Sequence, residues 1–272
     1  MSDESKAWRM ERDERSRKIK FFYADESWID IEGKRHLIMG AIAPYDPESL
    51  SFQMLKLKTD VGLAPLYEVK WNMKGDLGTE TRIALTNGVA DILHLECDGV
   101  ISLVEGTDKN LAAKLLCEQV HDYCTEEGFP AFAIYYDEGM IPDQERLRQL
   151  LEAEKDGPVC AGLQSVVSSS EQIIQCCDVF IGLFRQIMRH EIEKIRKPII
   201  VYYDDLNKEV EMTISEYTQM ITRFVLWGQC VDIETAIKHS TGRGFRVHSS
   251  MSATARKVLE KSIGTSYLGC MH

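Results

Sequence analysis

The sequence predicts an α/β fold in which a mixed β-sheet is flanked by helices. Three features lead to this prediction: two strand patterns joined by a tight turn near the N-terminus, an alternation of strand and helix patterns after them, and one long apolar helix. A hairpin makes its strands antiparallel, whereas a strand-helix-strand unit makes them parallel, so the sheet should contain both kinds of neighbour. With 272 residues the chain can bury a large core.

Local signals place the elements of the first 197 residues. Residues 1–17 mix acidic and basic side chains with few apolar ones and should form a polar arm. Glu32-Gly33-Lys34 is typical of a hairpin turn, Pro47 of a helix start and Gly128 of a helix end. The elements expected after the arm are strands over 19–25 and 37–43, helices over 47–58 and 79–95, a strand over 100–104, a helix over 110–126, a strand over 131–136, a helix from Pro142, a strand over 159–163 and a long helix from the Ser168–Glu171 cap to about Arg196.

The chain changes character after Pro198, which ends the long helix. A strand over 199–205, a helix over 215–227, a Gly/Arg-rich stretch over 241–246 and a last helix over 252–262 are expected there. The predicted organisation is therefore the arm, a main domain over 18–197, and a C-terminal α+β extension over 198–272 that could pack on the same domain.

Composition excludes several classes of protein. A net charge of -11 argues against general coating of nucleic acid or of a membrane surface. No apolar stretch approaches the length of about 18 residues that a membrane-spanning helix needs, and the charged start does not resemble a signal peptide. The 8 cysteines form no C-x-x-C pair, so neither a zinc site nor a disulfide framework is supported. We expect a cytoplasmic protein with reduced thiols and no membrane partner.

One segment departs from the acidic average. Between Lys238 and Lys261 there are six basic residues and a single acidic one, Glu260. Such a segment can form a local basic surface on an acidic body, and four of its residues are candidates for contacts with nucleic acid: Arg243, Arg246, Arg256 and Lys257. Two alternatives stay open, a solvated face without a ligand and a surface for protein interaction or oligomerisation.

Three aspartates stand where carboxylates are unusual or informative. Asp25 and Asp137 each follow a run of β-prone residues and should lie at the rim of the sheet, where loops build sites. Asp178 interrupts a helix that is apolar nearly all round, and Gly182 on its face should let the helix approach the sheet closely. A carboxylate in such a helix needs a cation, and several converging acids repel unless hard divalent ions hold them. Oxygen ligands without a matching His/Cys set favour Mg2+ or Mn2+.

Four short motifs in one order resemble domain-of-unknown-function family 3800, which is placed among the ribonuclease-H-like nucleases. The motifs are Asp25-Glu26-Ser27, Glu68-Val69-Lys70, Asp137-Glu138 and the pair Gln175 and Asp178 on the long helix. The resemblance covers about residues 18–190 and implies that the domain over 18–197 is a ribonuclease-H-like nuclease domain. Cys177 replaces the usual small residue before the helix aspartate.

The resemblance implies a two-metal nuclease that hydrolyses phosphodiester bonds of DNA or RNA, in defence against foreign nucleic acid. Asp25, Glu68, Asp137 and Asp178 would bind two Mg2+ or Mn2+ ions, with Asp25 between them. Lys70 would orient the attacking water or a phosphate, or it is a plain surface lysine. Glu26 is a further candidate ligand, although neighbours on a strand point to opposite faces and a role in the turn competes.

Two other interpretations stay open. The Glu-x-Lys motif also suits a restriction-endonuclease-like nuclease that would use Asp60, Glu68 and Lys70, but this leaves Asp178 unexplained. A non-catalytic module with a ribonuclease-H-like fold could instead bind nucleic acid or a protein. The expected partner is a nucleic-acid substrate, and the sequence allows a homo-oligomer or a regulatory protein in addition.

Overall fold

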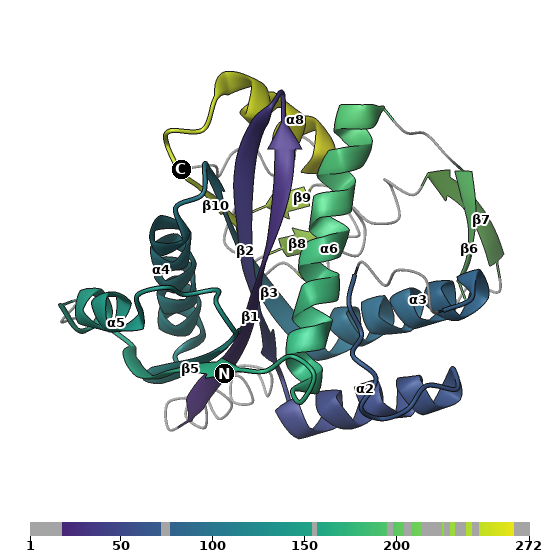
Figure 1. Ribbon diagram of the computed structural model, residues 1–272, viewed down its shortest axis with the longest axis horizontal. Coiled ribbons are helices and arrows are strands. Elements are labelled where there is room, and N and C mark those ends of the chain that lie inside the picture. Colours follow the sequence, from purple (N-terminus) through teal and green to yellow (C-terminus); the bar gives the residue numbers. More distant parts are fainter. Residues whose placement is uncertain are drawn as a thin grey trace, which may run out of the picture.

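A mixed sheet of six strands forms the centre of the protein (Figure 1). The computed structural model describes residues 18–71, 77–153, 157–194, 198–203, 208–213, 225, 229–231, 238–240 and 245–263. The predicted arm over 1–17, most of the predicted helix over 215–227, and Arg243 lie outside these residues. The strands are β1 (Ile19–Ile31), β2 (Lys34–Pro44), β3 (Cys97–Glu105), β4 (Ala131–Asp137), β5 (Val159–Val166) and β10 (Phe245–Val247), and they lie in the order β10-β3-β2-β1-β4-β5.

Both predicted kinds of strand pairing are present. β1, β2 and β3 form an antiparallel meander, whereas β4 pairs with β1, and β5 with β4, in the parallel sense. The turn between β1 and β2 places Glu32 and Gly33 at φ of 51° and 77°, the left-handed region that a tight hairpin requires. These pairings confirm the predicted α/β fold class, a mixed sheet flanked by helices.

β1 is longer than the sequence predicted, and this matters for the site. The expected strand ended at Asp25, but β1 continues to Ile31 because its hairpin with β2 is paired as far as Ile31 and Lys34. β4 pairs with β1 only up to Ala24 and Tyr136. Among the strands that the structure describes, none pairs with the β4 side of β1 beyond that point, so Asp25 stands where β1 becomes a free edge.

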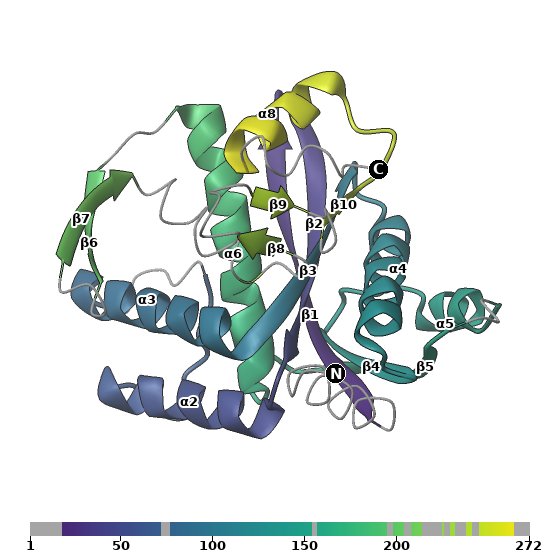
Figure 2. The ribbon, with the colours of Figure 1, turned by 180° about the vertical axis from the view of Figure 1, so that it is seen from behind.

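Helices cover both faces of the sheet (Figures 1 and 2). On one face lie α3 (Thr79–Glu96) and α6 (Gln172–Glu193), with α2 (Pro47–Asp60) and α8 (Ala253–Ile263) packed on α6, and on the other lie α4 (Lys109–Glu127) and α5 (Gln144–Ala153). Successive residues of β1 pack into the cores on opposite faces of the sheet: Tyr23 packs on the α6 side and Phe22 on the α4 side. No helix in the described ranges is long and apolar enough to cross a membrane.

The glycine that brings α6 close to the sheet lies on the sheet. A Cβ added to Gly40 would come within 2.9 Å of Ile181, and the thiol of Cys177 donates to the Gly40 carbonyl at 3.5 Å. Our expectation that Gly182 faces the sheet is wrong. Gly182 is covered by Trp71, whose Cγ would lie 2.1 Å from an added Cβ, so the small residue makes room for an indole.

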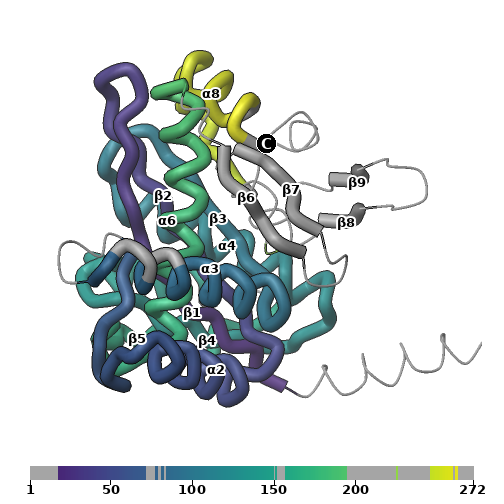
Figure 3. The backbone as a smooth tube through the Cα atoms, turned by 90° about the vertical axis from the view of Figure 1, so that its right-hand side faces the viewer, coloured from purple at the N-terminus to yellow at the C-terminus, as the bar shows by residue number. Residues whose placement is uncertain are grey.

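Parts of the C-terminal segment belong to the same body. β10 pairs with β3 in parallel, which makes it the outermost strand next to β3, and α8 lies beside α6 (Figure 3). Two further pairs are antiparallel: β6 (Pro198–Tyr203) with β7 (Lys208–Thr213), and β8 (Gln229–Val231) with β9 (Lys238–Ser240).

Candidate active site

Three aspartates from three separate elements come together at the end of β4. The parallel pairing of Ala24 with Tyr136 brings the next residues, Asp25 and Asp137, to the same edge of the sheet. α6 packs across β1 and carries Asp178, whose charge raises the pKa of Asp25. Asp137 in turn raises the pKa of both Asp25 and Asp178. The three carboxylates are therefore close enough to repel one another.

Burial makes this repulsion costly for Asp25. The residue is 9% exposed, and loss of hydration is the largest influence on its pKa, followed by the charge of Asp178. The backbone N–H of Glu26 donates to Asp25 Oδ1 at 2.6 Å and opposes the shift, but the pKa of Asp25 still rises to about 8. Without a cation, Asp25 would hold a proton at neutral pH. A bound cation would compensate the charge of the ionised carboxylate, so the cluster favours one.

Asp178 is half-buried and is held by one oxygen. Its Oδ2 accepts the backbone N–H of Trp71 at 2.6 Å. Burial raises the pKa of Asp178, and the Trp71 N–H and the ammonium of Lys70 only partly offset it. Because Oδ2 is already bonded to the backbone, Oδ1 is the atom with capacity for another ligand.

Residues 67–71 are held in place by side chains of α6. The segment is not a strand, yet its backbone is bonded as if it lay at a sheet edge. Gln175 Oε1 accepts the N–H of Val69 at 3.0 Å, and Asp178 accepts the N–H of Trp71 two residues later. Gln175 and Asp178 are three residues apart and therefore share one side of the helix. The Gln-x-x-Asp motif thus clamps the segment that contains Glu68 and Lys70.

A buried lysine supports this clamp. The side chain of Lys58, at 0% exposure, donates to Gln175 Oε1 at 2.8 Å, to Pro65 O at 3.4 Å and to Gln172 Oε1. Burial lowers the pKa of Lys58. Sequence reasoning missed this residue, although a signal was present: Lys58 continues the buried stripe of Leu50 and Met54 at intervals of four residues along α2.

Glu68 is engaged by its neighbours in this structure. It forms an ion pair with Lys70 at 2.9 Å and accepts the hydroxyl of Ser168. Burial is the largest single influence on its pKa and raises it, but Ser168 and Lys70 together outweigh burial, and the pKa of Glu68 is lowered. Glu68 raises the pKa of Lys70, and Asp137 and Asp178 add to the effect, so this ammonium lies near the acidic cluster.

Glu26 lies on the opposite face of β1 from Asp25. Its Oε1 accepts Lys109 Nζ from the start of α4 at 2.5 Å, and its Oε2 is buried without a hydrogen-bond partner in the described part of the chain. Burial raises the pKa of Glu26, and Lys109 opposes the shift. The strand therefore separates this carboxylate from the face of Asp25 and Asp178.

The side chains are not arranged as a closed metal site. In the described ranges no group of three or more His, Cys, Asp or Glu residues has metal-binding spacing. The contacts above give the reason, because Asp25 Oδ1 and Asp178 Oδ2 accept backbone N–H groups and Glu68 is paired with Lys70. The donor set still suits a hard divalent ion, since it consists of carboxylate oxygens, and burial and neighbouring carboxylates raise the pKa of Asp25 and Asp178.

The remaining predicted residues lie elsewhere. Asp60 is exposed at the end of α2. Arg246 forms ion pairs with Glu118 and Asp122 of α4, both at 2.6 Å. Arg256 donates to the carbonyls of Met251 and Ser249, Lys257 is exposed, and Arg243 is outside the described residues.

Two solved structures are similar to this chain at 13% sequence identity. One is a complex of PCNA with ribonuclease HII from Archaeoglobus fulgidus (TM-score 0.34, covering 93% of this chain and 94% of that chain), and the other is ribonuclease H2 from Pyrococcus horikoshii OT3 (TM-score 0.31, covering 89% and 98%). Likenesses of this size assign no role to any residue. No family model matches the sequence, and no curated protein matches it either.

Proposed function

We propose that the protein is a nuclease that hydrolyses phosphodiester bonds of DNA or RNA with Mg2+ or Mn2+. The observation that supports it most directly is the convergence of Asp25, Asp137 and Asp178, with the pKa of buried Asp25 raised to about 8. Such a cluster opposes folding unless a cation compensates it, and perturbed acids of this kind mark functional sites. The role in defence against foreign nucleic acid rests only on the resemblance to family 3800.

In this proposal the residues have separate tasks. Asp25, Asp137 and Asp178 would hold the ions, together with Glu68, whose partners in this structure are Lys70 and Ser168. When bound, the ions would supply an activated water and stabilise the leaving oxygen. Lys70, released from Glu68, is then available to orient a substrate phosphate. Gln175 holds the 67–71 segment so that Glu68 and Lys70 stay beside the cluster.

Asp178→Asn tests the proposal because it removes a charge and preserves the shape of the side chain. We expect Mn2+ to raise the Tm of the wild type by roughly 5 °C at about 100 times its Kd, and EDTA to reverse the rise. Asp178→Asn should lose this response and reduce cleavage of labelled RNA, single-stranded DNA or duplex DNA on the order of 100-fold or more.

Asp60→Asn is the matched control, since Asp60 is an exposed aspartate outside the cluster. It should melt and cleave as the wild type does. Loss of cleavage in Asp60→Asn with retention in Asp178→Asn would favour the restriction-endonuclease-like interpretation. Identical melting curves in Mn2+, Mg2+ and EDTA, together with no cleavage of any substrate, would leave the non-catalytic module.

A further inference from the structure

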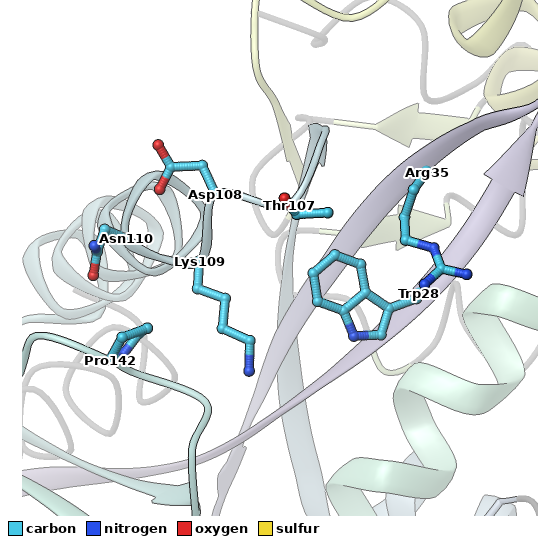
Figure 4. A pocket seen from close by; sticks show the side chains of 7 residues that line it. All are labelled: Trp28, Arg35, Thr107, Asp108, Lys109, Asn110 and Pro142. Carbon is cyan, nitrogen blue, oxygen red and sulfur yellow. The ribbon is translucent and has the colours of Figure 1, made fainter.

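A cavity of about 510 Å³ opens on the α4 side of the sheet, next to β1. Trp28 of β1 and Arg35 of β2 form one wall, and the start of α4 at Thr107–Asn110 together with Pro142 forms the other. Figure 4 shows the indole of Trp28 between Arg35 and Lys109. Cavities of this size hold small ligands of the dimensions of a nucleoside.

The cavity is connected to the acidic cluster through Glu26. Trp28 and Glu26 are two residues apart on β1 and therefore share a face. Glu26 Oε1 accepts Nζ of Lys109, which lines the cavity, and the Glu26 N–H donates to Asp25 Oδ1. Trp28 lies three positions after Asp25 on β1, a rise of about 10 Å along the strand.

The free edge of β1 offers a path between the two faces. β4 stops pairing at Ala24, so in the described residues no strand covers the β4 side of β1 where Asp25, Glu26 and Trp28 follow. A polymer that lies on the Asp25 face can pass over this edge to the Trp28 face. A small substrate that binds only on the Asp25 face would not reach the Trp28 face.

The charges in the cavity favour a planar uncharged group over a phosphate. Lys109 donates to Glu26 and to the Gly139 carbonyl, and Arg35 donates to Asp30 at 3.1 and 3.3 Å. The lining also contains the carboxylate of Asp108, which caps α4 by accepting the N–H of Leu111. The group in the lining that is available to a ligand is the indole of Trp28. The Arg35 guanidinium lies 6.0 Å from the centre of this ring, and this cation–π contact holds the ring in place.

We propose that Trp28 stacks on a nucleobase, so that this cavity is a subsite for single-stranded nucleic acid. A base reaches a protein aromatic ring only when it is unstacked from its own neighbours, which a single strand allows and an intact duplex does not. The inference rests on the proposed nuclease function and narrows its substrate to strands with unpaired bases next to the bond that is cut.

Binding in EDTA tests the subsite without any cleavage. The probes are fluorescent oligo(dT), oligo(U) and a duplex of mixed sequence, followed by anisotropy. Trp28→Ala should weaken binding of the single strands by about 5- to 150-fold, because stacking of a base on an aromatic residue has that effect. Trp28→Phe, which keeps a ring, should stay within about threefold of the wild type. Phe52→Ala, an equally aromatic but remote change at a residue 68% exposed on α2, should have no effect.

The outcomes separate the subsite from the proposed function. Unchanged single-strand binding in Trp28→Ala, an equal loss for single strands and duplex, or a wild type that binds no probe would each overturn the subsite. If the wild type binds single strands through Trp28 but cleaves nothing in Mn2+, the subsite stands and the nuclease proposal fails. If the wild type cleaves in Mn2+, and Trp28→Ala binds and cleaves as the wild type does, the nuclease proposal stands and the subsite fails.

Discussion

Asp25 is a carboxylic acid in a place where water cannot stabilise its charge. Burial and the charges of Asp178 and Asp137 raise its pKa to about 8, although the backbone N–H of Glu26 opposes the shift. A group of this kind makes stability depend on pH, because the folded and unfolded chains release its proton at different pH values.

The direction of that dependence follows from the two pKa values. The unfolded chain releases the Asp25 proton near its ordinary value of 3.8, and the folded protein releases it near 8. Between these values the folded state binds more protons, so the free energy of unfolding falls as the pH rises. The contribution is complete below the unfolded pKa and is lost as the pH passes the folded one.

We therefore predict that, in EDTA, the free energy of unfolding of the wild type falls by about 3 kcal/mol between about pH 5 and pH 8. Asp25→Asn, which does not titrate, should show a flatter profile in urea unfolding over the same range. Saturating Mn2+ should flatten the wild-type profile as well, since the ion replaces the proton. Parallel profiles for the wild type and Asp25→Asn would contradict the raised pKa.

Which site residues the sequence could predict depended on where their partners lie. The strand-end positions of Asp25 and Asp137 and the apolar surroundings of Asp178 are visible in local pattern, and the structure brings these three together. Lys58 depends on contacts with Gln172 and Gln175, more than 110 residues away, and a local pattern does not contain them.

At the level of elements, the 67–71 segment shows that side chains of a helix can supply the hydrogen-bond acceptors that a neighbouring strand would otherwise supply. Two side chains of α6 accept the N–H groups of Val69 and Trp71, while the intervening residue Lys70 is exposed. The sequence shows that Glu68 and Lys70 alternate with apolar residues. It could not show that the hydrogen-bond partners are side chains of a helix, since such partners have no strand pattern of their own.

Gln175→Met and Gln172→Met form a matched pair that tests the clamp. Both remove an acceptor of Lys58 from the same helix, so both should destabilise the protein by about 1–3 kcal/mol. Only Gln175 touches the segment, so only Gln175→Met should make the Val69 amide exchange about tenfold faster.

Hydrogen exchange measured by NMR distinguishes the two variants, with the Cys97 region of α3 and β3 as an internal reference. The Mn2+-induced rise in Tm should shrink in Gln175→Met and persist in Gln172→Met. Equal exchange at Val69 in both variants would show that Gln175 contributes to stability alone and does not position the segment.

For the molecule as a whole, the C-terminal region contributes to the same sheet and core as the N-terminal part. β10 pairs with β3, and α8 packs on α6. The sequence indicated a last helix and a basic segment, but the attachment of β10 depends on pairing across more than 140 residues. Three-residue strands such as β10 leave too short a pattern to be recognised locally.

Arg246 tests whether the basic segment contacts nucleic acid or is engaged within the protein. Its guanidinium bonds Glu118 and Asp122, so Arg246→Ala should lower stability by about 1 kcal/mol and the Tm by a few degrees. The exposed Lys257 provides the control, and Lys257→Ala should melt as the wild type does.

The same pair answers the question of nucleic-acid binding. Because Arg246 is already engaged by α4, its replacement should leave the salt dependence of binding unchanged. A reduction of the salt slope by about one unit in Arg246→Ala would instead restore the view that this side chain contacts a phosphate.

The packing of Trp71 on Gly182 also gives the protein an optical signal of its own. The indole is fixed against α6 while its backbone N–H is bonded to Asp178, so any change at that carboxylate acts on the same residue. Emission from Trp71 should therefore shift in wavelength or intensity when an ion arrives, without a label or a substrate. With the other three tryptophans, Trp8, Trp28 and Trp227, replaced by Phe, this emission would let metal affinity be titrated directly and compounds that compete for the ions be screened in solution.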